Sequence, residues 1–306
     1  MRRPTTIPLV LALAALIVLA ATTDRFFTWD NVKAILSSAS LVGIVALGLT
    51  FVTLAGSMVS LAVGPSAVLA AMVFLSALNA GLLPALLLAI AAGAAIAALQ
   101  GALVGLWNVN PVILTIGAGF LIVGFAEKAY GEATVRPEGG GFATLNSVPL
   151  GIPVAVYVMI GVALAFQYLL TRTVLGRQIL LVGESREAAR AAGIPVARVV
   201  TAAFALAGAA YALGGAFLGS FNMGASTYLE GTLTFDAIAA VLIGGTSIAG
   251  GHGSPLRTLG GALAVAAITD LLLLRGLGTG PQILLKGLLV VTVVIATQRR
   301  LNGAQA

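Results

Sequence analysis

The sequence lacks cysteine and has a single histidine, His252, among its 306 residues. The lack of cysteine excludes disulfides, thiolate nucleophiles and cysteine metal sites. A metal centre or a Ser/His/Asp triad would have to be built around His252, so we expect neither a metal site nor a catalytic residue. Charged residues make up 8% of the chain, against about 25% in ordinary soluble domains. A chain with so little charge cannot form a water-soluble surface.

Aromatic residues are also scarce, whereas glycine is abundant with 38 residues, and the mean hydropathy is +1.09. Small residues let helices pack closely where lipid provides no hydrophobic driving force. Apolar runs such as residues 86–106 and 284–297 are long and show no alternation, which argues against a β-barrel. We therefore predict an all-α polytopic membrane protein that forms one domain over residues 1–306.

About ten segments have the composition of transmembrane or re-entrant helices. They are residues 7–22, 34–54, 60–78, 84–107, 112–130, 152–170, 199–219, 236–250, 258–274 and 283–298. The third and the eighth are interrupted by glycine and are candidates for re-entrant segments. The first segment follows Arg2 and Arg3 and also has features of a signal peptide, whose removal would leave nine segments.

The distribution of basic residues predicts the orientation of the chain. With an even number of segments, the loops on the side of the termini hold ten basic residues and the opposite loops hold five. We therefore expect both termini to be cytoplasmic. The net charge of +6 then reflects cytoplasmic loops in contact with membrane lipid, and we expect no nucleic-acid partner.

The loop formed by residues 171–198 contains the pattern of a short capped helix. Ser185 is a suitable N-cap, Glu187 would lie in the first turn, and Gly193 with Pro195 would end the helix. Arg186 and Arg190 would share one face, and alanines keep the other face small. Such a helix could fit into a groove of another protein. Alternatively, it is a solvated loop helix whose arginines only fix the topology.

Three stretches in the same order resemble the permeases of ABC importers of the monosaccharide branch. The loop matches in Thr173, Gly176-Arg177, Gly183, Glu187-Ala188-Ala189-Arg190 and Gly193-Ile194. Residues 108–117 (NVNPVILTIG) resemble a segment in which Asn and Pro precede an apolar run ending in Thr-x-Gly. Residues 235–261 resemble the most recognisable family signature, which runs from Asp-Ala-Ile-Ala through Gly-Gly-Thr-Ser to Gly-Gly-x-Gly-Ser.

The resemblance implies a membrane-spanning subunit of a binding-protein-dependent importer that moves a sugar or sugar-like solute across the bacterial inner membrane. No GxxxxGK[ST] sequence occurs, so the chain cannot hydrolyse ATP itself and is not an enzyme. The implied partners are a cytoplasmic ABC ATPase that uses ATP and magnesium, a periplasmic or extracellular sugar-binding protein, and a second permease subunit. The residues implied in coupling to the ATPase are Ser185, Arg186, Glu187, Ala188, Ala189, Arg190 and Gly193.

One stretch departs from the family pattern. Where the family typically has Gly-Gly-Ile-Asp-Leu-Ser-Val-Gly, this chain has Ser57-Met58-Val59-Ser60-Leu61-Ala62-Val63-Gly64. Ser60 replaces an aspartate and Ala62 replaces a serine. The departure bears on the specificity of transport more than on the fold.

A pathway for a sugar requires side chains that form hydrogen bonds with hydroxyl groups more than it requires charged side chains. The polar residues that we predict at membrane depth are Ser57, Ser60, Ser66, Gln100, Asn108, Asn110 and Thr115, and Asp236 begins the eighth segment, where a helix N-terminus favours negative charge. Each of the polar residues could instead form a hydrogen bond between helices.

Two other classes of function need consideration. A secondary transporter driven by an ion gradient requires a titrating group at membrane depth, for which Asp270 is the candidate. Asp270 could instead form a structural ion pair with Arg275. An intramembrane enzyme lacks its parts, because the sequence has one histidine, no cysteine and no convergent pair of buried carboxylates.

Overall fold

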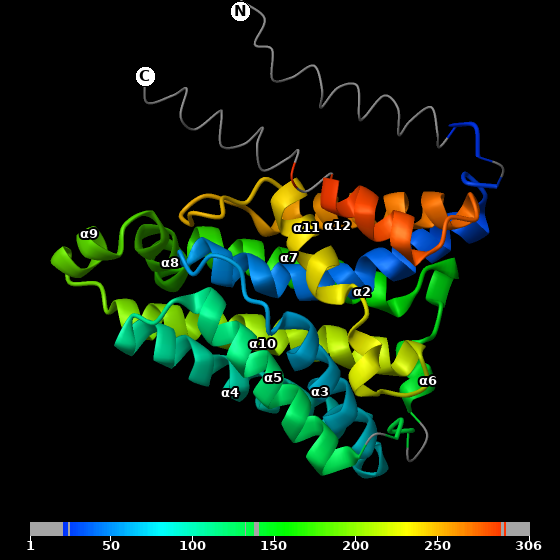
Figure 1. Ribbon diagram of the computed structural model, residues 1–306, viewed down its shortest axis with the longest axis horizontal. Coiled ribbons are helices and arrows are strands. Elements are labelled where there is room, and N and C mark those ends of the chain that lie inside the picture. The colour runs from blue at the N-terminus through cyan, green and yellow to red at the C-terminus, as the bar shows by residue number, and fades with distance from the viewer. Residues whose placement is uncertain (1–20, 24, 132, 138–140, 289–290, 292–306) are drawn as a thin grey trace, which may run out of the picture.

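The computed structural model describes residues 21–23, 25–131, 133–137, 141–288 and 291, and all the regular elements in this part are helices (Figure 1). The α-helices are α2 (Trp29–Leu54), α3 (Val63–Ser76), α4 (Leu82–Trp107), α5 (Pro111–Tyr130), α6 (Phe142–Leu145), α7 (Val154–Arg172), α8 (Val174–Glu184), α9 (Arg186–Ala191), α10 (Val196–Phe221), α11 (Leu233–Ile243) and α12 (Pro255–Leu274). The 3-10 helices are η1 (Leu78–Ala80), η2 (Pro149–Gly151) and η3 (Thr227–Glu230), and residues 279–288 are also helical.

Six of these helices, α2, α4, α5, α7, α10 and α12, are long and apolar enough to cross a membrane. They have 19 to 26 residues, whereas a crossing needs about 20 residues. The predicted all-α membrane protein is thus confirmed. Residues 7–20, 289–290 and 292–298 of the first and last predicted segments lie outside the described residues. The count of about ten segments and the cytoplasmic termini therefore stay predictions.

The third and eighth predicted segments contain helices that are too short to cross a membrane alone. Helix α3 has 14 residues and α11 has 11, and at a rise of 1.5 Å per residue they are about 21 Å and 16 Å long. The predicted segment 236–250 is wrong in its second part, because α11 ends at Ile243. Gly245 and Gly250 have φ of +75° and +96°, which an α-helix cannot accommodate.

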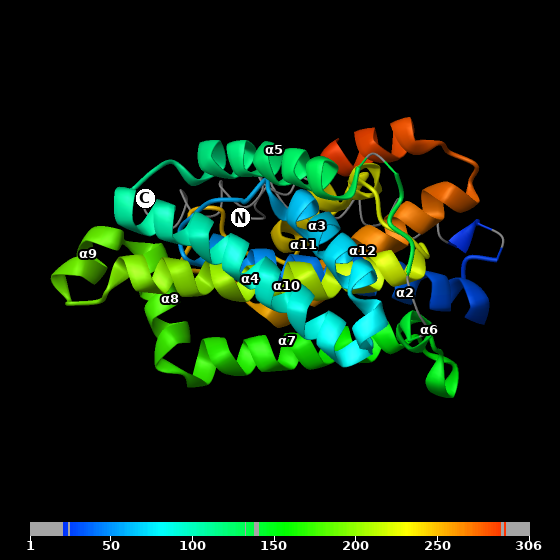
Figure 2. The same ribbon diagram turned by 90° about the horizontal axis from the view of Figure 1, so that it is seen from below.

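Helices α2 and α10 form the core of the bundle (Figures 1 and 2). They contact each other, α3 and α4 pack against α10, and α11 and α12 pack against α2. From Gly43 to Ala55 every residue of this part of α2 is buried, as expected for a helix surrounded by other helices rather than by lipid.

Glycine makes the contact between α4 and α10 possible. A Cβ at Gly101 would lie 2.6 Å from Cβ of Phe204, and one at Gly105 would lie 2.8 Å from Cα of Ala197. These two glycines stand one turn apart on α4, so the backbones of α4 and α10 approach closely along one face. The abundance of glycine in the sequence reflects this packing.

The two halves of the chain have the same order of elements and run in opposite directions. In the first half α2 is followed by residues 55–62, the short helix α3 and the long helix α4; in the second half α10 is followed by residues 222–232, the short α11 and the long α12. We call residues 55–62 the first break and residues 222–232 the second break. Inverted repeats of this kind, with broken helices near the middle of the bilayer, are typical of transporters.

The two ends of the bundle differ in what they contain. Helices α8 and α9 lie at the end where α2 and α4 finish and α10 begins, which we call the α9 end (Figure 1). At the opposite end, the α6 end, Asn146 next to α6 donates a hydrogen bond to the carbonyl of Ser220 at 2.7 Å, and Val135 forms an isolated antiparallel bridge with Ala225.

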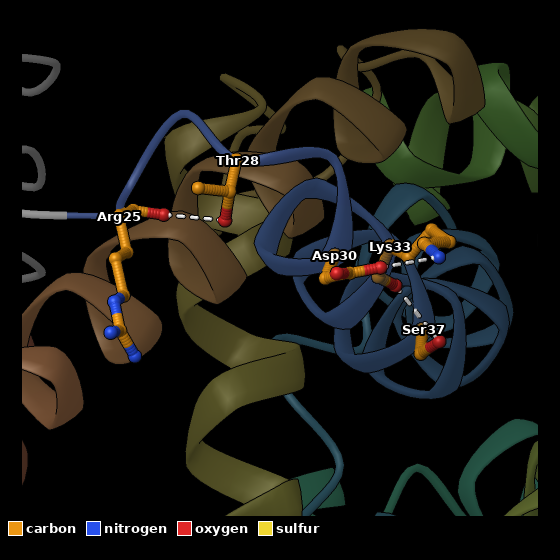
Figure 3. A network of polar contacts seen from close by, with 5 residues as sticks. All are labelled: Arg25, Thr28, Asp30, Lys33 and Ser37. Atoms are coloured by element: carbon orange, nitrogen blue, oxygen red, sulfur yellow. Dashed lines mark hydrogen bonds and ion pairs between the residues drawn. The ribbon is translucent and has the colours of Figure 1, made fainter.

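Helix α2 begins at the α6 end with a small polar network (Figure 3). The Thr28 hydroxyl donates to the carbonyl of Arg25 at 2.8 Å, and Lys33 Nζ lies 2.6 Å from an oxygen of Asp30. The Ser37 hydroxyl donates to the carbonyl of Lys33 at 2.9 Å. The charges at the start of α2 are therefore paired within its own first turns.

Candidate functional site

Helix α8 leads from the long helix α7 into the α9 loop. The Thr173 hydroxyl accepts the N–H of Gly176 at 3.1 Å and caps the helix. Gly176, Ile179 and Val182 are buried at intervals of three, so α8 rests on the bundle with one apolar face. The sequence analysis missed α8, although this spacing of buried positions is a helix signal.

Helix α9 is capped at both ends. The Ser185 hydroxyl accepts the N–H of Ala188 at 3.2 Å. At the other end Gly193 has φ +77°, its N–H donates to the carbonyl of Arg190 at 2.9 Å, and the N–H of Ile194 donates to the carbonyl of Ala189 at 2.9 Å. This pair of bonds is a Schellman motif. The short capped helix predicted from the sequence is present, while its role stays a prediction.

The side chains of α9 divide between the bundle and the solvent. Arg186 Nη1 and Arg190 Nη2 lie 3.3 Å and 3.5 Å from Oδ1 of Asn108, so the two arginines share one face as predicted. Ala189 is buried within the chain's own core, with 4% of its surface exposed. Glu187 and Ala188 are exposed. The small side chain of Ala189 therefore serves packing within this chain, and Glu187 and Ala188 are accessible to a partner.

Arg186 reaches from α9 into the first break. Its Nη2 donates to the Ser57 hydroxyl at 3.0 Å and to the carbonyl of Gly56 at 3.4 Å. Burial, and to a lesser extent the charge of Arg190, lower the pKa of the Arg186 guanidinium from its usual value. An arginine remains protonated in a protein nonetheless. Arg186 therefore places a positive charge at the start of the first break, and the groups that it bonds there are a hydroxyl and a carbonyl, not a carboxylate.

Four glycines bring three distant segments together next to Arg186. They are Gly56 at the start of the first break, Gly183 near the end of α8, and Gly250 and Gly251 in the loop between α11 and α12. We call this set the glycine junction. A Cβ at Gly250 would lie 2.6 Å from Cα of Gly56 and 2.8 Å from the carbonyl oxygen of Gly183. The N–H of Gly251 donates to the carbonyl of Leu54 at 3.0 Å, so the three backbones are in direct contact.

The second break contacts the start of α3 inside the bundle, next to the start of α11. The Thr234 hydroxyl accepts the N–H of Gly64 at 3.0 Å and donates to a carboxylate oxygen of Glu230 at 2.7 Å. A Cβ at Gly64 would overlap the Glu230 carboxylate. The carboxylate thus lies against the N-terminus of α3, where negative charge is favourable.

Asp236, predicted as a pathway residue, forms an ion pair in the interior. Its Oδ1 lies 2.7 Å from Nζ of Lys286, and its Oδ2 accepts the Thr232 hydroxyl at 2.7 Å. Both side chains of the pair are about nine-tenths buried, with 10% and 11% exposed. The sequence analysis missed Lys286, although a lysine inside the predicted segment 283–298 requires a partner.

The remaining predicted pathway residues fall into two groups. Ser57, Ser60, Ser66, Gln100 and Thr115 are buried, and the Thr115 hydroxyl accepts the N–H of Leu61 in the first break at 3.1 Å. Asn108 is the exposed C-cap of α4, in the left-handed region, and Asn110 caps α5 by accepting the N–H groups of Val112 and Ile113. The two asparagines therefore lie at helix ends at the α9 end, and the role of all these residues in a pathway stays a prediction.

The other polar residues considered in the sequence analysis, Asp270, Arg275 and His252, each contact a polar side chain. Asp270 accepts a hydrogen bond from Nδ2 of Asn31 in α2 at 2.7 Å, and Arg275 donates to the hydroxyl of Thr23 at 2.8 Å. His252 Nε2 lies 3.8 Å from a carboxylate oxygen of Glu184. Among the described residues, no group of three or more His, Cys, Asp or Glu side chains could hold a metal ion.

The sequence that forms this site can be compared with those of known proteins. The sequence model of the family described as "Branched-chain amino acid transport system / permease component" matches residues 31–297, which is most of the chain. The chain belongs to this permease family. No solved structure is a significant match to the permease.

Relatives of the permease align over nearly the whole chain. The ribose import permease protein RbsC of Escherichia coli (strain K12) is 33% identical over 306 residues, covering 95% of this chain and 93% of the relative. The autoinducer 2 import system permease protein LsrD of Yersinia enterocolitica is 34% identical over 303 residues, covering 93% of this chain and 90% of the relative. The resemblance to monosaccharide ABC importer permeases, inferred from the three motifs, is thereby confirmed.

Proposed function

We propose that this permease is the membrane-spanning subunit of a binding-protein-dependent ABC importer, and that it moves a sugar or sugar-like solute across the inner membrane of a bacterium. A separate cytoplasmic ATPase hydrolyses ATP with magnesium and docks on α9, and the permease itself binds no cofactor. The observation that supports this most is α9, a short helix with a cap at each end, held by Arg186 to the bundle while Glu187 and Ala188 face outward.

The orientation follows from charge. The α9 end holds Arg172, Arg177, Arg186, Arg190, Arg198 and Arg257, and all six belong to the loops that the sequence analysis assigned to the more basic side. The α9 end is then cytoplasmic by the positive-inside rule. The α6 end faces outward and receives the solute-binding protein, and a second permease subunit, the same or a related chain, completes the importer.

The solute is proposed to be rich in hydroxyl groups. Ser60 and Thr115 provide hydroxyls in and next to the first break, and Thr234 and Glu230 provide a hydroxyl and a carboxylate at the second break, groups suited to hydrogen-bonding a sugar. A branched-chain amino acid would need unpaired charges for its ammonium and carboxylate groups, whereas Asp236 is paired with Lys286. The names of RbsC and LsrD agree with a sugar-like solute.

An ion-driven carrier that uses Asp270 is less well supported. Asp270 lies four residues before the end of α12 and is bonded to Asn31, so it is placed as a structural group. Uptake that survives depletion of ATP and collapses with a proton uncoupler would nevertheless favour that reading.

The test is uptake into proteoliposomes that contain the permease, ABC ATPases of sugar importers and a ribose-loaded binding protein. We expect ATP-dependent uptake of labelled ribose and not of labelled leucine. Replacing both Glu187 and Arg190 by Ala should abolish association of the ATPase and uptake together. Arg177→Ala, an exposed change on neighbouring α8, is the matched control and should retain both. Leucine uptake, or no ATPase association with the wild-type chain, would contradict the proposal.

A further inference from the structure

Helix α9 makes a contact with the transmembrane part that docking of an ATPase does not require. Arg186 donates to Oγ of Ser57 at 3.0 Å, to the carbonyl of Gly56 at 3.4 Å and to Oδ1 of Asn108 at 3.3 Å. Two of these acceptors belong to the first break and the third ends α4. One side chain therefore connects the first residue of α9 to the point where the chain turns back into the bundle.

The side chain that Arg186 bonds in the first break, Ser57, is buried, and the turn around it has a fixed geometry. Ser57 has no exposed surface. It stands between Gly56 and Met58, whose φ values of +67° and +53° are both in the left-handed region. Few conformations satisfy two left-handed residues in a run of three. A displacement of the guanidinium therefore moves this turn as a unit, or leaves the buried Ser57 hydroxyl without this donor.

The glycine junction extends this connection to the second half. The end of α8 touches the first break through Gly183 and Gly56, and the loop after α11 touches both through Gly250 and Gly251. No flexible side chain lies between these backbones to absorb a movement. A shift of α8 and α9 is thus transferred by contact to the segment that precedes α3 and to the segment that follows α11.

We propose that Arg186 is a positioning residue that links α9 to the first break, and that the glycine junction moves both short helices together when α9 is displaced. The proposal rests on the proposed function, because the displacement of α9 comes from the ATPase. It assigns Arg186 a role inside the permease, distinct from the partner contacts assigned to Glu187 and Arg190. The planar, multidentate guanidinium matters here, and a lysine is not equivalent.

The absence of cysteine from the chain makes a direct test possible. Met58→Cys places a thiol in the first break at a position with 48% exposure, and Tyr228→Cys places one in the second break with 81% exposure. Each variant is reconstituted with the ATPase that associates with the wild-type chain. The labelling rate by a water-soluble maleimide is then measured without nucleotide and with ATP plus vanadate. We expect the rate to change at both positions.

The same labelling is repeated after Arg186→Gln, Arg186→Lys and Ser57→Ala. Each should keep the ATPase associated and remove the nucleotide-dependent change at Met58→Cys. Each should also lower the solute imported per ATP by about tenfold, the effect of losing one hydrogen bond from a charged group. Arg198→Gln, an exposed arginine at the start of α10, is the control and should change neither quantity.

The outcomes separate the two proposals. If no ATPase associates with the wild-type chain, the proposed function fails and this inference fails with it. If wild-type transport is coupled and Arg186→Gln and Arg186→Lys retain the nucleotide-dependent labelling change, the role of Arg186 is wrong and the proposed function stands. If only Met58→Cys responds in the otherwise unchanged chain, the glycine junction does not move the two short helices together.

Discussion

The two breaks have the same place in their halves and differ in how they are stabilised. Each contains one methionine and one glycine at left-handed φ, Met58 with Gly56 in the first and Met223 with Gly231 in the second. The first break is uncharged, and a charged side chain from outside, Arg186 of the α9 loop, donates hydrogen bonds to it. The second contains Glu230 and leads into Asp236. The same architecture thus contains an uncharged break bonded to the α9 loop and a charged break bonded to the rest of the bundle.

The difference shows what a buried charge requires. A carboxylate at membrane depth is costly unless it is paired, and Glu230 and Asp236 both have partners. Glu230 lies against the N-terminus of α3 and accepts from Thr234, while Asp236 pairs with Lys286 and accepts from Thr232. These bonds fix the second break to α3 and to the helix of residues 279–288. The first break lacks such bonds and is the one better suited to follow α9.

The largest loss of stability is expected from Lys286→Met, which tests how the second break is stabilised. The change leaves the carboxylate of Asp236 buried without its cation, which should lower the free energy of unfolding by about 3–5 kcal/mol. Denaturation of the purified permease in detergent measures it. The double variant Lys286→Met, Asp236→Asn removes both charges and should recover most of the loss. Equal instability of the single and double variants would show that the ion pair does not stabilise the second break.

A smaller effect is expected from Gly64→Ala, where the second break contacts the start of α3. The added Cβ overlaps the Glu230 carboxylate, and overpacking of this kind costs about 1–3 kcal/mol. Adding Glu230→Ala to Gly64→Ala should relieve the overlap, so the two changes should be non-additive in the same denaturation assay. Strict additivity would mean that Glu230 does not contact the start of α3.

The smallest effect is expected from Thr115→Val. The change removes the acceptor for the N–H of Leu61 in the first break, and hydrogen bonds between membrane helices contribute about 1 kcal/mol or less. Thr115→Ser keeps the hydroxyl and should behave as wild type. A loss in Thr115→Val as large as that of Lys286→Met would contradict the view that the first break is held less strongly than the second.

The sequence predicts features well where they depend on neighbouring residues, namely the long helices and the ends of α9. Long apolar runs determine the six long helices, because burial of an apolar helix in lipid depends on composition alone. Ser185 and Gly193 determine the ends of α9 through bonds within the helix. Both are local effects that can be read from neighbouring residues.

The sequence fails where the structure depends on contacts between distant segments. Asp236 and Lys286 are 50 positions apart, and no local pattern pairs them. Asn108 accepts hydrogen bonds from Arg186 and Arg190, which lie 78 and 82 positions further along the chain. The inverted repeat of the two halves is also not evident from the sequence. The first break contains two serines and the second contains the acid Glu230, so similar backbones carry dissimilar side chains.

The most direct test of the central claim, that α9 couples ATP hydrolysis to transport, is the ratio of solute imported to ATP hydrolysed for Gly193→Val. Gly193 has φ +77° and an added Cβ would meet no atom within 4 Å, so the change strains the C-terminal cap of α9 and causes no clash. We predict normal amounts of protein in the membrane, continued ATP hydrolysis and a strongly reduced ratio. Gly193→Asn, which tolerates the left-handed region, should keep the ratio near that of wild type. A normal ratio in Gly193→Val would contradict coupling through α9.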